Sequence, residues 1–262
     1  MAPYLVGVSL KMYFSHARTL AWCSAVAEVA RAHPAVRDGA AELFVIPSYL
    51  SVTAAVDLLR GVAAVGAQDL AMEDEGAFTG EVSGAEIAEV GCRVVEVGHA
   101  ERRRLFGETD AVVRAKTDAA LRNGLAPVLC VGEAERGDPE SVAQECVRQV
   151  DDALSSARAA GRNGHVIVAY EPLWAIGADS PAEPDYIRSV CAHLRRHLDS
   201  SPDFAGSRVI YGGSARPGLL GEIADDVDGL FLGRFAHRAE SLEEVLDEVL
   251  STRAALQAAG GR

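Results

Sequence analysis

The sequence has few cysteines, and none of them lies in a pattern that binds a metal ion. The five cysteines are scattered and odd in number, and no Cys-x-x-Cys or Cys/His pair has metal-ligand spacing. Scattered thiols do not form the disulfide framework of a secreted protein, so we predict a reduced, cytoplasmic protein with buried thiols. We also expect no metal ion and no cofactor. The five residues are Cys23, Cys92, Cys130, Cys146 and Cys191.

The chain is also poor in basic residues and has no long apolar run. It carries 25 lysines and arginines against 38 aspartates and glutamates among 262 residues, a formal net charge of −13. Such an acidic balance argues against nucleic acid and anionic membranes as partners. No stretch reaches the roughly 20 apolar residues of a transmembrane helix, and the N-terminus lacks the basic region of a signal peptide. We therefore expect neither a nucleic-acid partner nor a membrane partner.

The sequence also lacks features of a second domain and of a dinucleotide-binding fold. Linkers and low-complexity segments are absent, so residues 1–262 are predicted to form a single domain. No Gly-x-Gly-x-x-Gly motif follows the first apolar run, which argues against an open dinucleotide-binding sheet.

What the chain does contain is a regular alternation of short apolar runs and helical patterns, repeated eight times. Short apolar strands throughout are typical of a parallel sheet that is covered on both faces. The unbroken alternation predicts an α/β fold, the closed (β/α)8 TIM barrel. The expected strands are residues 4–8, 42–46, 62–67, 92–97, 127–131, 165–169, 208–211 and 229–232.

Polar side chains follow most of these apolar runs. In a barrel of parallel strands the active site lies where the strands end, so one cation, one imidazole and several carboxylates are expected to meet on one rim. These residues are Ser9 and Lys11, Gln68, His99 with Glu101, Glu133, Glu171, Ser214, and Gly233 with Arg234.

The stretch from Glu171 onward is the most informative of these strand ends. Pro172 stops the preceding strand because it has no N–H to donate to a neighbouring strand. The loop that follows carries two large apolar side chains, Trp174 and Ile176, and then Gly177. Apolar side chains in a loop need burial, so we interpret this segment as a lid that closes over a carboxylate.

Three motifs lie at the ends of the fourth, sixth and seventh apolar runs: Gly98-His99-Ala100-Glu101-Arg102-Arg103, Ala169-Tyr170-Glu171-Pro172-Leu173-Trp174-Ala175-Ile176-Gly177 and Tyr211-Gly212-Gly213-Ser214. They closely resemble those of triosephosphate isomerase, and together with shorter matches they cover nearly the whole chain in the same order. We therefore expect the barrel fold and an isomerase of this family.

The resemblance implies roles for four side chains in an aldose–ketose isomerisation of a short sugar phosphate. Glu171 would be the base that moves a proton between adjacent carbons, and His99 would be the electrophile that acidifies the C–H bond. Lys11 would stabilise the enediolate, and Glu101 would orient Lys11 or relay protons.

The resemblance also implies a phosphate site and a partner. Backbone N–H groups of Gly177, Ser214, Gly233 and Arg234 would hold the phosphate, and Ser9 and Lys11 would contact the substrate. The loop of residues 72–82 resembles the loop that, in this family, inserts a threonine, here Thr79, into the neighbouring subunit's site. A homodimer through this loop is therefore expected.

Several positions depart from the family's pattern while the base, the electrophile and the lysine remain. A serine that precedes x-Lys, and Gly-Arg after the last strand, resemble the branch that acts on a four-carbon ketose, erythrulose 1-phosphate. We favour that substrate over dihydroxyacetone phosphate and glyceraldehyde 3-phosphate. The departures are Ser9 for Asn, Leu10 for Trp, Ala100 for Ser, Ala178-Asp179 for Thr-Gly and Arg234 for Gly.

Three alternatives stay open. One is an authentic triosephosphate isomerase of glycolysis and gluconeogenesis. Another is a non-catalytic barrel that binds a sugar phosphate, and the departures in the site would suit it. The third is a metal-dependent aldolase barrel, although no cluster of histidines and carboxylates has readable ligand geometry.

Overall fold

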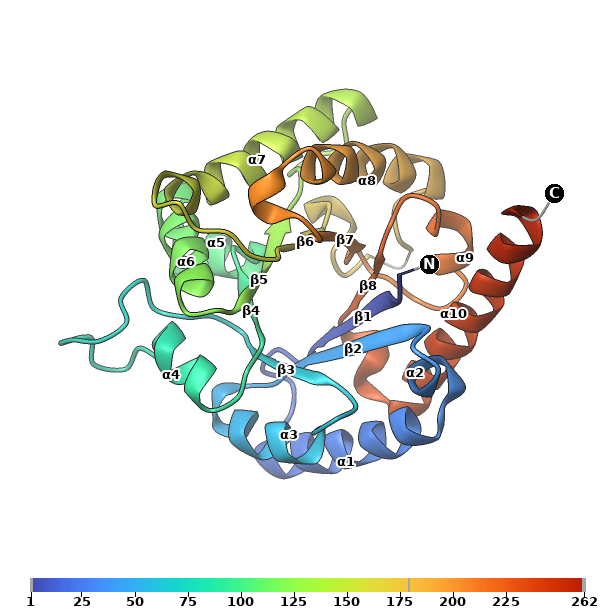
Figure 1. Ribbon diagram of the computed structural model, residues 1–262, viewed down its shortest axis with the longest axis horizontal. Coiled ribbons are helices and arrows are strands. Elements are labelled where there is room, and N and C mark those ends of the chain that lie inside the picture. The colour runs from blue at the N-terminus through green and yellow to red at the C-terminus, as the bar shows by residue number, and fades with distance from the viewer. Residues whose placement is uncertain (1, 179, 261–262) are drawn as a thin grey trace.

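Eight parallel strands form a closed barrel in the computed structural model, which describes residues 2–178 and 180–260 (Figure 1). The strands pair in chain order, and β1 also pairs with β8, so the barrel has no free edge. The predicted α/β TIM barrel is confirmed. The strands are β1 Tyr4–Ser9, β2 Ala41–Ile46, β3 Ala64–Ala67, β4 Val94–Val97, β5 Ala126–Val131, β6 Ile167–Tyr170, β7 Arg208–Tyr211 and β8 Gly229–Leu232.

Helices surround the strands as an outer layer (Figure 1). The α-helices are α1 His16–Ala32, α2 Pro34–Arg37, α3 Val52–Leu58, α4 Gly84–Glu89, α5 Ala100–Phe106, α6 Asp110–Arg122, α7 Pro139–Ala159, α8 Pro184–Asp199, α9 Leu220–Ile223 and α10 Ala239–Gly260. Short 3-10 turns are η1 Tyr49–Ser51, η2 Leu173–Ala175, η3 Pro202–Phe204 and η4 Arg234–His237.

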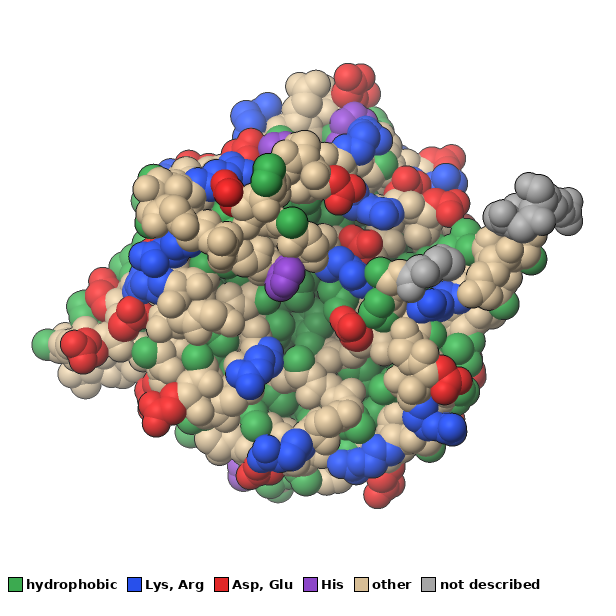
Figure 2. Space-filling view, in the orientation of Figure 1, with side chains coloured by type: hydrophobic (Ala, Val, Ile, Leu, Met, Phe, Trp, Pro, Cys, Tyr) green, Lys and Arg blue, Asp and Glu red, His purple; other side chains and the backbone are tan. Residues whose placement is uncertain are grey.

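Alternation along the strands separates two cores, because successive side chains point to opposite faces. The larger core lies between the strands and the helices, and a smaller one fills the barrel, where Phe44 and Phe231 lie side by side. A Cβ atom at Gly7 would stand 2.0 Å from Cζ of Phe44, so only glycine leaves room for that ring. Figure 2 shows apolar side chains gathered over the barrel at the centre of the view, with charged side chains around them.

The expected element bounds differ from the structure in a few places. Strands β3 and β4 begin two residues later than the apolar runs, because the N–H groups of Val62 and Cys92 bond to the carbonyls of Leu59 and Ile87 and close the preceding turns. The short helix α2 was not expected, although Pro34 at its first turn suits a helix start.

Two further findings bear on the expectations from composition. All five cysteines are buried and unpaired with one another. Within the part of the chain that the structure describes, no helix is long and apolar enough to cross a bilayer.

Candidate active site

Glu171 follows the last residue of β6 and is held there by its own backbone, whose N–H donates to the carbonyl of Val131 at 2.8 Å. The side chain is only 6% exposed, and a Cβ at Gly212 would lie 2.5 Å from its Oε1, so glycine makes room for the carboxylate. Its Oε2 is buried without a hydrogen-bond partner. Burial raises the pKa of Glu171; the nearby His99 counters part of this rise and Glu96 adds to it. The carboxylate is therefore a stronger base than a solvated one.

His99 caps the N-terminus of α5 and lies beside this carboxylate. The backbone N–H of Glu101 donates to Nδ1 at 3.1 Å, so the proton of the neutral ring is on Nε2. Nε2 is 3.6 Å from Oε2 of Glu171. The structure thus brings a buried carboxylate and an imidazole N–H to the two sides of one small space.

Lys11 lies just beyond β1 in a backbone conformation that is unusual for a lysine, with φ of 47°. The side chain of Gln68 donates to the carbonyl of Lys11 at 2.9 Å and stabilises this turn. Nζ of Lys11 lies 3.0 Å from Oε1 of Glu101. Burial alone would lower the pKa of Lys11, but the hydrogen bond and the charge of Glu101 outweigh it and raise the pKa. The lysine therefore carries its charge at the rim of the site.

Glu101 is the fourth predicted side chain, and it lies between the other two groups. Its Oε2 is 3.8 Å from Nδ1 of His99, and its Oε1 binds Lys11. Burial would raise the pKa of Glu101, but the hydrogen bond and charge of Lys11 prevail and lower it. The arrangement fits a carboxylate that holds the lysine in place.

The sequence prediction did not include Glu96, which the structure places in the same site. The residue is 3% exposed, accepts a hydrogen bond from Oγ of Ser9 at 2.9 Å, and has its Oε1 3.8 Å from Nε2 of His99. The signal for it was a single acidic residue inside the apolar run Val94-Val95-Glu96-Val97. No motif marks such a residue, but a charge in a buried strand needs an explanation.

The first residues of the predicted lid are anchored by a buried carboxylate, Glu133. The indole Nε1 of Trp174 donates to Oε1 of Glu133 at 2.7 Å, and the hydroxyls of Tyr170 and Tyr186 donate to the same carboxylate. Three donors fix the start of the loop. Trp174 is therefore an anchor of the lid and does not close over the substrate itself.

The tip of the lid is tied to the loop after β7. The N–H of Gly177 donates to Oγ of Ser214 at 3.1 Å, and that hydroxyl donates to the carbonyl of Ala175 at 2.8 Å. The N–H of Ser214 donates to the carbonyl of Gly212. Two of the four predicted phosphate donors are thus hydrogen-bonded within the chain. Asp179, one of the departures noted above, lies outside the described residues.

Gly233 and Arg234 lie after β8, opposite this tip. Arg234 begins the η4 turn and is exposed, and its Nη2 lies 3.7 Å from the point where a Cβ on Gly177 would stand. A guanidinium therefore faces the lid at the expected phosphate position.

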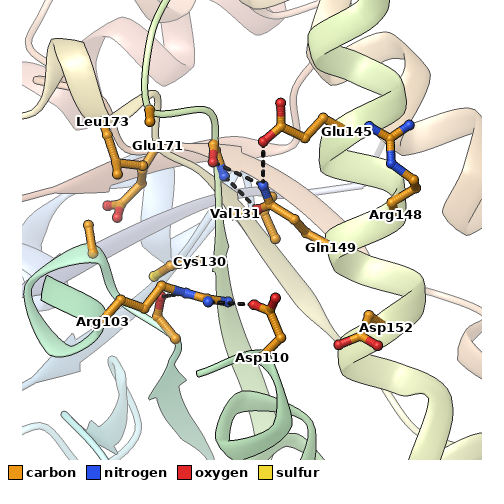
Figure 3. Close-up of a pocket in the computed structure, with 14 residues that line it drawn as sticks. Arg103, Asp110, Cys130, Val131, Glu145, Arg148, Gln149, Asp152, Glu171 and Leu173 are labelled. Carbon is orange, nitrogen blue, oxygen red and sulfur yellow. Dashed lines mark hydrogen bonds and ion pairs between the residues drawn. The ribbon is translucent and has the colours of Figure 1, made fainter. Parts of the chain in front are cut away.

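A cavity of about 420 Å³ opens at Glu171 and extends toward α6 and α7 (Figure 3). Glu171 and Leu173 lie on one side of it, the ion pair between Arg103 and Asp110 lies on another, and Cys130 lies between Glu171 and Arg103. Of the predicted site residues only Glu171 lines this cavity, which lies beside the space shared by Glu171 and His99 and does not include it. Within residues 2–178 and 180–260, no three His, Cys, Asp or Glu side chains are arranged to hold a metal ion.

The curated relatives of the chain include two kinds of isomerase. Curated relatives include the L-erythrulose-1-phosphate isomerase of Pectobacterium atrosepticum, 49% identical over 94% of this chain and 95% of that protein. The L-erythrulose-1-phosphate isomerase of Rhizobium rhizogenes is 38% identical over 93% of each chain. The triosephosphate isomerase of Mycobacteroides abscessus is 39% identical over 87% of this chain and 90% of that one. A sequence model of the family described as Triosephosphate isomerase matches residues 4–249, and the chain belongs to that family.

Proposed function

We propose that this protein is an isomerase that moves the carbonyl of a short sugar phosphate to the neighbouring carbon through an enediolate. The observation that carries the proposal is the 3.6 Å distance between Oε2 of Glu171 and Nε2 of His99. The carboxylate is buried, its Oε2 has no partner, and burial raises its pKa. These are the properties of a general base for a C–H proton.

His99 and Lys11 would supply the electrophilic help that the base needs. The proton on Nε2 of His99 would be donated to the substrate's carbonyl oxygen as negative charge develops there. The ammonium of Lys11, held by Glu101, would stabilise the same enediolate by its charge.

We propose erythrulose 1-phosphate as the substrate and dihydroxyacetone phosphate as the competing triose. The names and identities of two relatives support the four-carbon sugar, as does the short side chain of Ser9. With phosphate on C1 and the carbonyl at C2, the enediolate can form only toward C3. Glu171 would take the proton from C3 and return it to C2, and a proton would pass from the C3 oxygen to the C2 oxygen. The carbonyl therefore moves to C3, and no other reactant is consumed.

The phosphate would be held where the lid meets the loops after β7 and β8. The backbone N–H groups of Gly177, Ser214, Gly233 and Arg234 are the proposed donors. The two that are bonded within the chain would exchange those partners for phosphate oxygens. The guanidinium of Arg234 would add a charge-assisted hydrogen bond from the open side.

We propose a homodimer in the cytoplasm, formed through residues 72–82 and the neighbouring loops. That loop extends away from the barrel (Figure 1), and Phe78 and Thr79 on it are exposed. Large apolar side chains are exposed after each of the four adjacent strands β1–β4, an arrangement that favours a protein partner. They are Met12, Tyr13, Tyr49, Leu50, Met72, Phe78, Leu105 and Phe106.

Steady-state kinetics with both sugars test the substrate. We expect a higher kcat/KM for erythrulose 1-phosphate than for dihydroxyacetone phosphate, with E171Q prepared in the same way as the control for contaminating isomerase. A clear preference for the triose would instead identify a triosephosphate isomerase of glycolysis and gluconeogenesis. In deuterated water an isomerase labels the substrate carbon, whereas a non-catalytic sugar-phosphate-binding barrel leaves it unlabelled.

A further inference from the structure

The residue that needs explanation is Glu96, which lies inside the barrel. Val94 belongs to the interior core, and alternation places Glu96 on the same face one step nearer the active site. The side chain is 3% exposed in a strand that is otherwise apolar. Burying a carboxylate costs free energy unless hydrogen bonds or a cation compensate for the lost water.

That compensation is small at Glu96. An ionised carboxylate has about four acceptor positions. The neutral hydroxyl of Ser9 occupies one, on Oε2, and Oε1 lies 3.8 Å from Nε2 of His99, beyond hydrogen-bond distance. No further hydrogen bond to Glu96 is present among residues 2–178 and 180–260. Glu133, by contrast, receives three donors. Glu96 therefore keeps an acceptor that the folded chain does not use.

The unused acceptor lies at the reacting end of the site. Nε2 of His99 is 3.6 Å from Glu171 and 3.8 Å from Oε1 of Glu96, so both carboxylates border the space in which the sugar would react. In the ring of eight strands, β4 lies opposite β8, where Arg234 and the proposed phosphate position are. A substrate whose phosphate lies at β8 thus extends its far carbons toward Glu96.

The chemistry of the two sugars differs at those far carbons. Dihydroxyacetone phosphate ends at the hydroxyl-bearing carbon that reacts, whereas erythrulose 1-phosphate continues with a further hydroxymethyl group. We propose that Glu96 is a specificity-determining residue whose Oε1 accepts a hydrogen bond from the terminal hydroxyl of the four-carbon sugar. This proposal rests on the proposed four-carbon substrate. Ser9 holds the other oxygen and fixes the orientation of the carboxylate.

The test compares the two substrates in three variants of the protein. E96L removes the acceptor with little change in volume, and E96Q keeps the volume but weakens the acceptor. E108Q alters a buried glutamate outside the site and is the matched control. Circular dichroism and thermal melting show whether each variant is folded.

We expect E96L to lower kcat/KM for erythrulose 1-phosphate about 10- to 100-fold, the usual effect of losing a hydrogen bond to a charged group. Its loss with dihydroxyacetone phosphate should be at least tenfold smaller, E96Q should fall between E96L and the wild type, and E108Q should leave the ratio of the two substrates unchanged. Equal losses with both sugars in folded E96L and E96Q would overturn the specificity role, while the substrate assignment would stand. A wild-type preference for the triose would overturn the substrate assignment and the role together.

Discussion

Two groups of buried acids in this protein have opposite surroundings. Asp69 and Glu108 are both bonded to the buried ammonium of Lys116 and to the guanidinium of Arg102, at distances of 2.6 to 2.7 Å. Each acid contacts two cations, and the network joins the end of β3 to α5 and α6.

Two buried acids of the active site, Glu171 and Glu96, have no cation bonded to them in the described part of the chain, whereas Glu101 is paired with Lys11. Glu171 has an imidazole nearby, at 3.6 Å, and Glu96 has one serine hydroxyl. The comparison teaches that the same residue type stabilises the fold where its charge is paired and is available for chemistry where it is not. Burying a carboxylate without a cation costs folding free energy, which packing elsewhere in the protein offsets.

The largest expected effect comes from neutralising the unpaired base. E171Q should lower kcat by roughly 10³- to 10⁴-fold, because the amide cannot take a proton from carbon. Binding of phosphoglycolate, followed by calorimetry, should be nearly retained. Unchanged turnover would remove Glu171 as the base.

The same variant should be more stable at neutral pH. A carboxyl whose folded-state pKa is raised loses stability when it ionises, so the wild type is penalised above the ordinary pKa of glutamate. The melting temperature of E171Q should exceed that of the wild type at pH 8, and the difference should shrink as the pH falls toward that ordinary value. A lower melting temperature at pH 8 would contradict this expectation.

Breaking the paired network should act on the fold and not on the chemistry. K116M leaves two buried carboxylates with one cation fewer, and we expect a loss of about 3–5 kcal/mol in the free energy of unfolding. Denaturant titration measures it. The matched control is R60M, which removes an exposed pair with Asp57 and should cost under about 1 kcal/mol. Equal losses in the two variants would show that the network is not a stabilising unit.

A smaller effect is expected where the lid is tied down. S214A removes the hydroxyl that donates to the carbonyl of Ala175, a hydrogen bond that remains when the N–H of Gly177 turns to the phosphate, so the substrate-bound lid loses one hydrogen bond. We expect kcat/KM to fall about fivefold, at roughly 1 kcal/mol for one neutral bond. S251A, which removes an exposed hydroxyl on α10, serves as the control. A loss no larger than that of the control would mean that this bond does not limit the reaction.

The smallest effect is a shift in the pH profile. Loss of activity at low pH should follow protonation of Glu171, so the acid limb of kcat/KM should lie above the ordinary pKa of glutamate. Glu96 raises the pKa of Glu171 through its charge, so E96Q should move that limb to lower pH. A limb that moves to higher pH would show that the two carboxylates do not interact in this way.

The barrel and the principal side chains could be predicted from sequence because their signals are local and repeated. Eight apolar runs specify the strands, and the segments around His99 and Glu171 are long enough to identify the family. Lys11 needed only its place after the first strand. These residues meet because parallel strands end at one rim.

Glu96 could not be predicted in the same way. Its importance depends on which face of β4 points inward and on Ser9, a partner 87 positions away in the sequence. No spacing rule links such a pair. The role of Trp174 as an anchor of the lid could not be predicted either, because its hydrogen bond to Glu133 joins two different loops. Tertiary contacts of this kind appear only once the barrel closes.

The two tryptophans have a practical consequence. Trp22 is buried on α1, where its indole donates to the carbonyl of Ala236, whereas Trp174 is half-buried at the root of the lid. A W22F variant would emit from a single indole, which lies at the start of the predicted lid. Stopped-flow fluorescence of this variant, mixed with substrate, would therefore measure the rate at which the surroundings of Trp174 change when substrate binds.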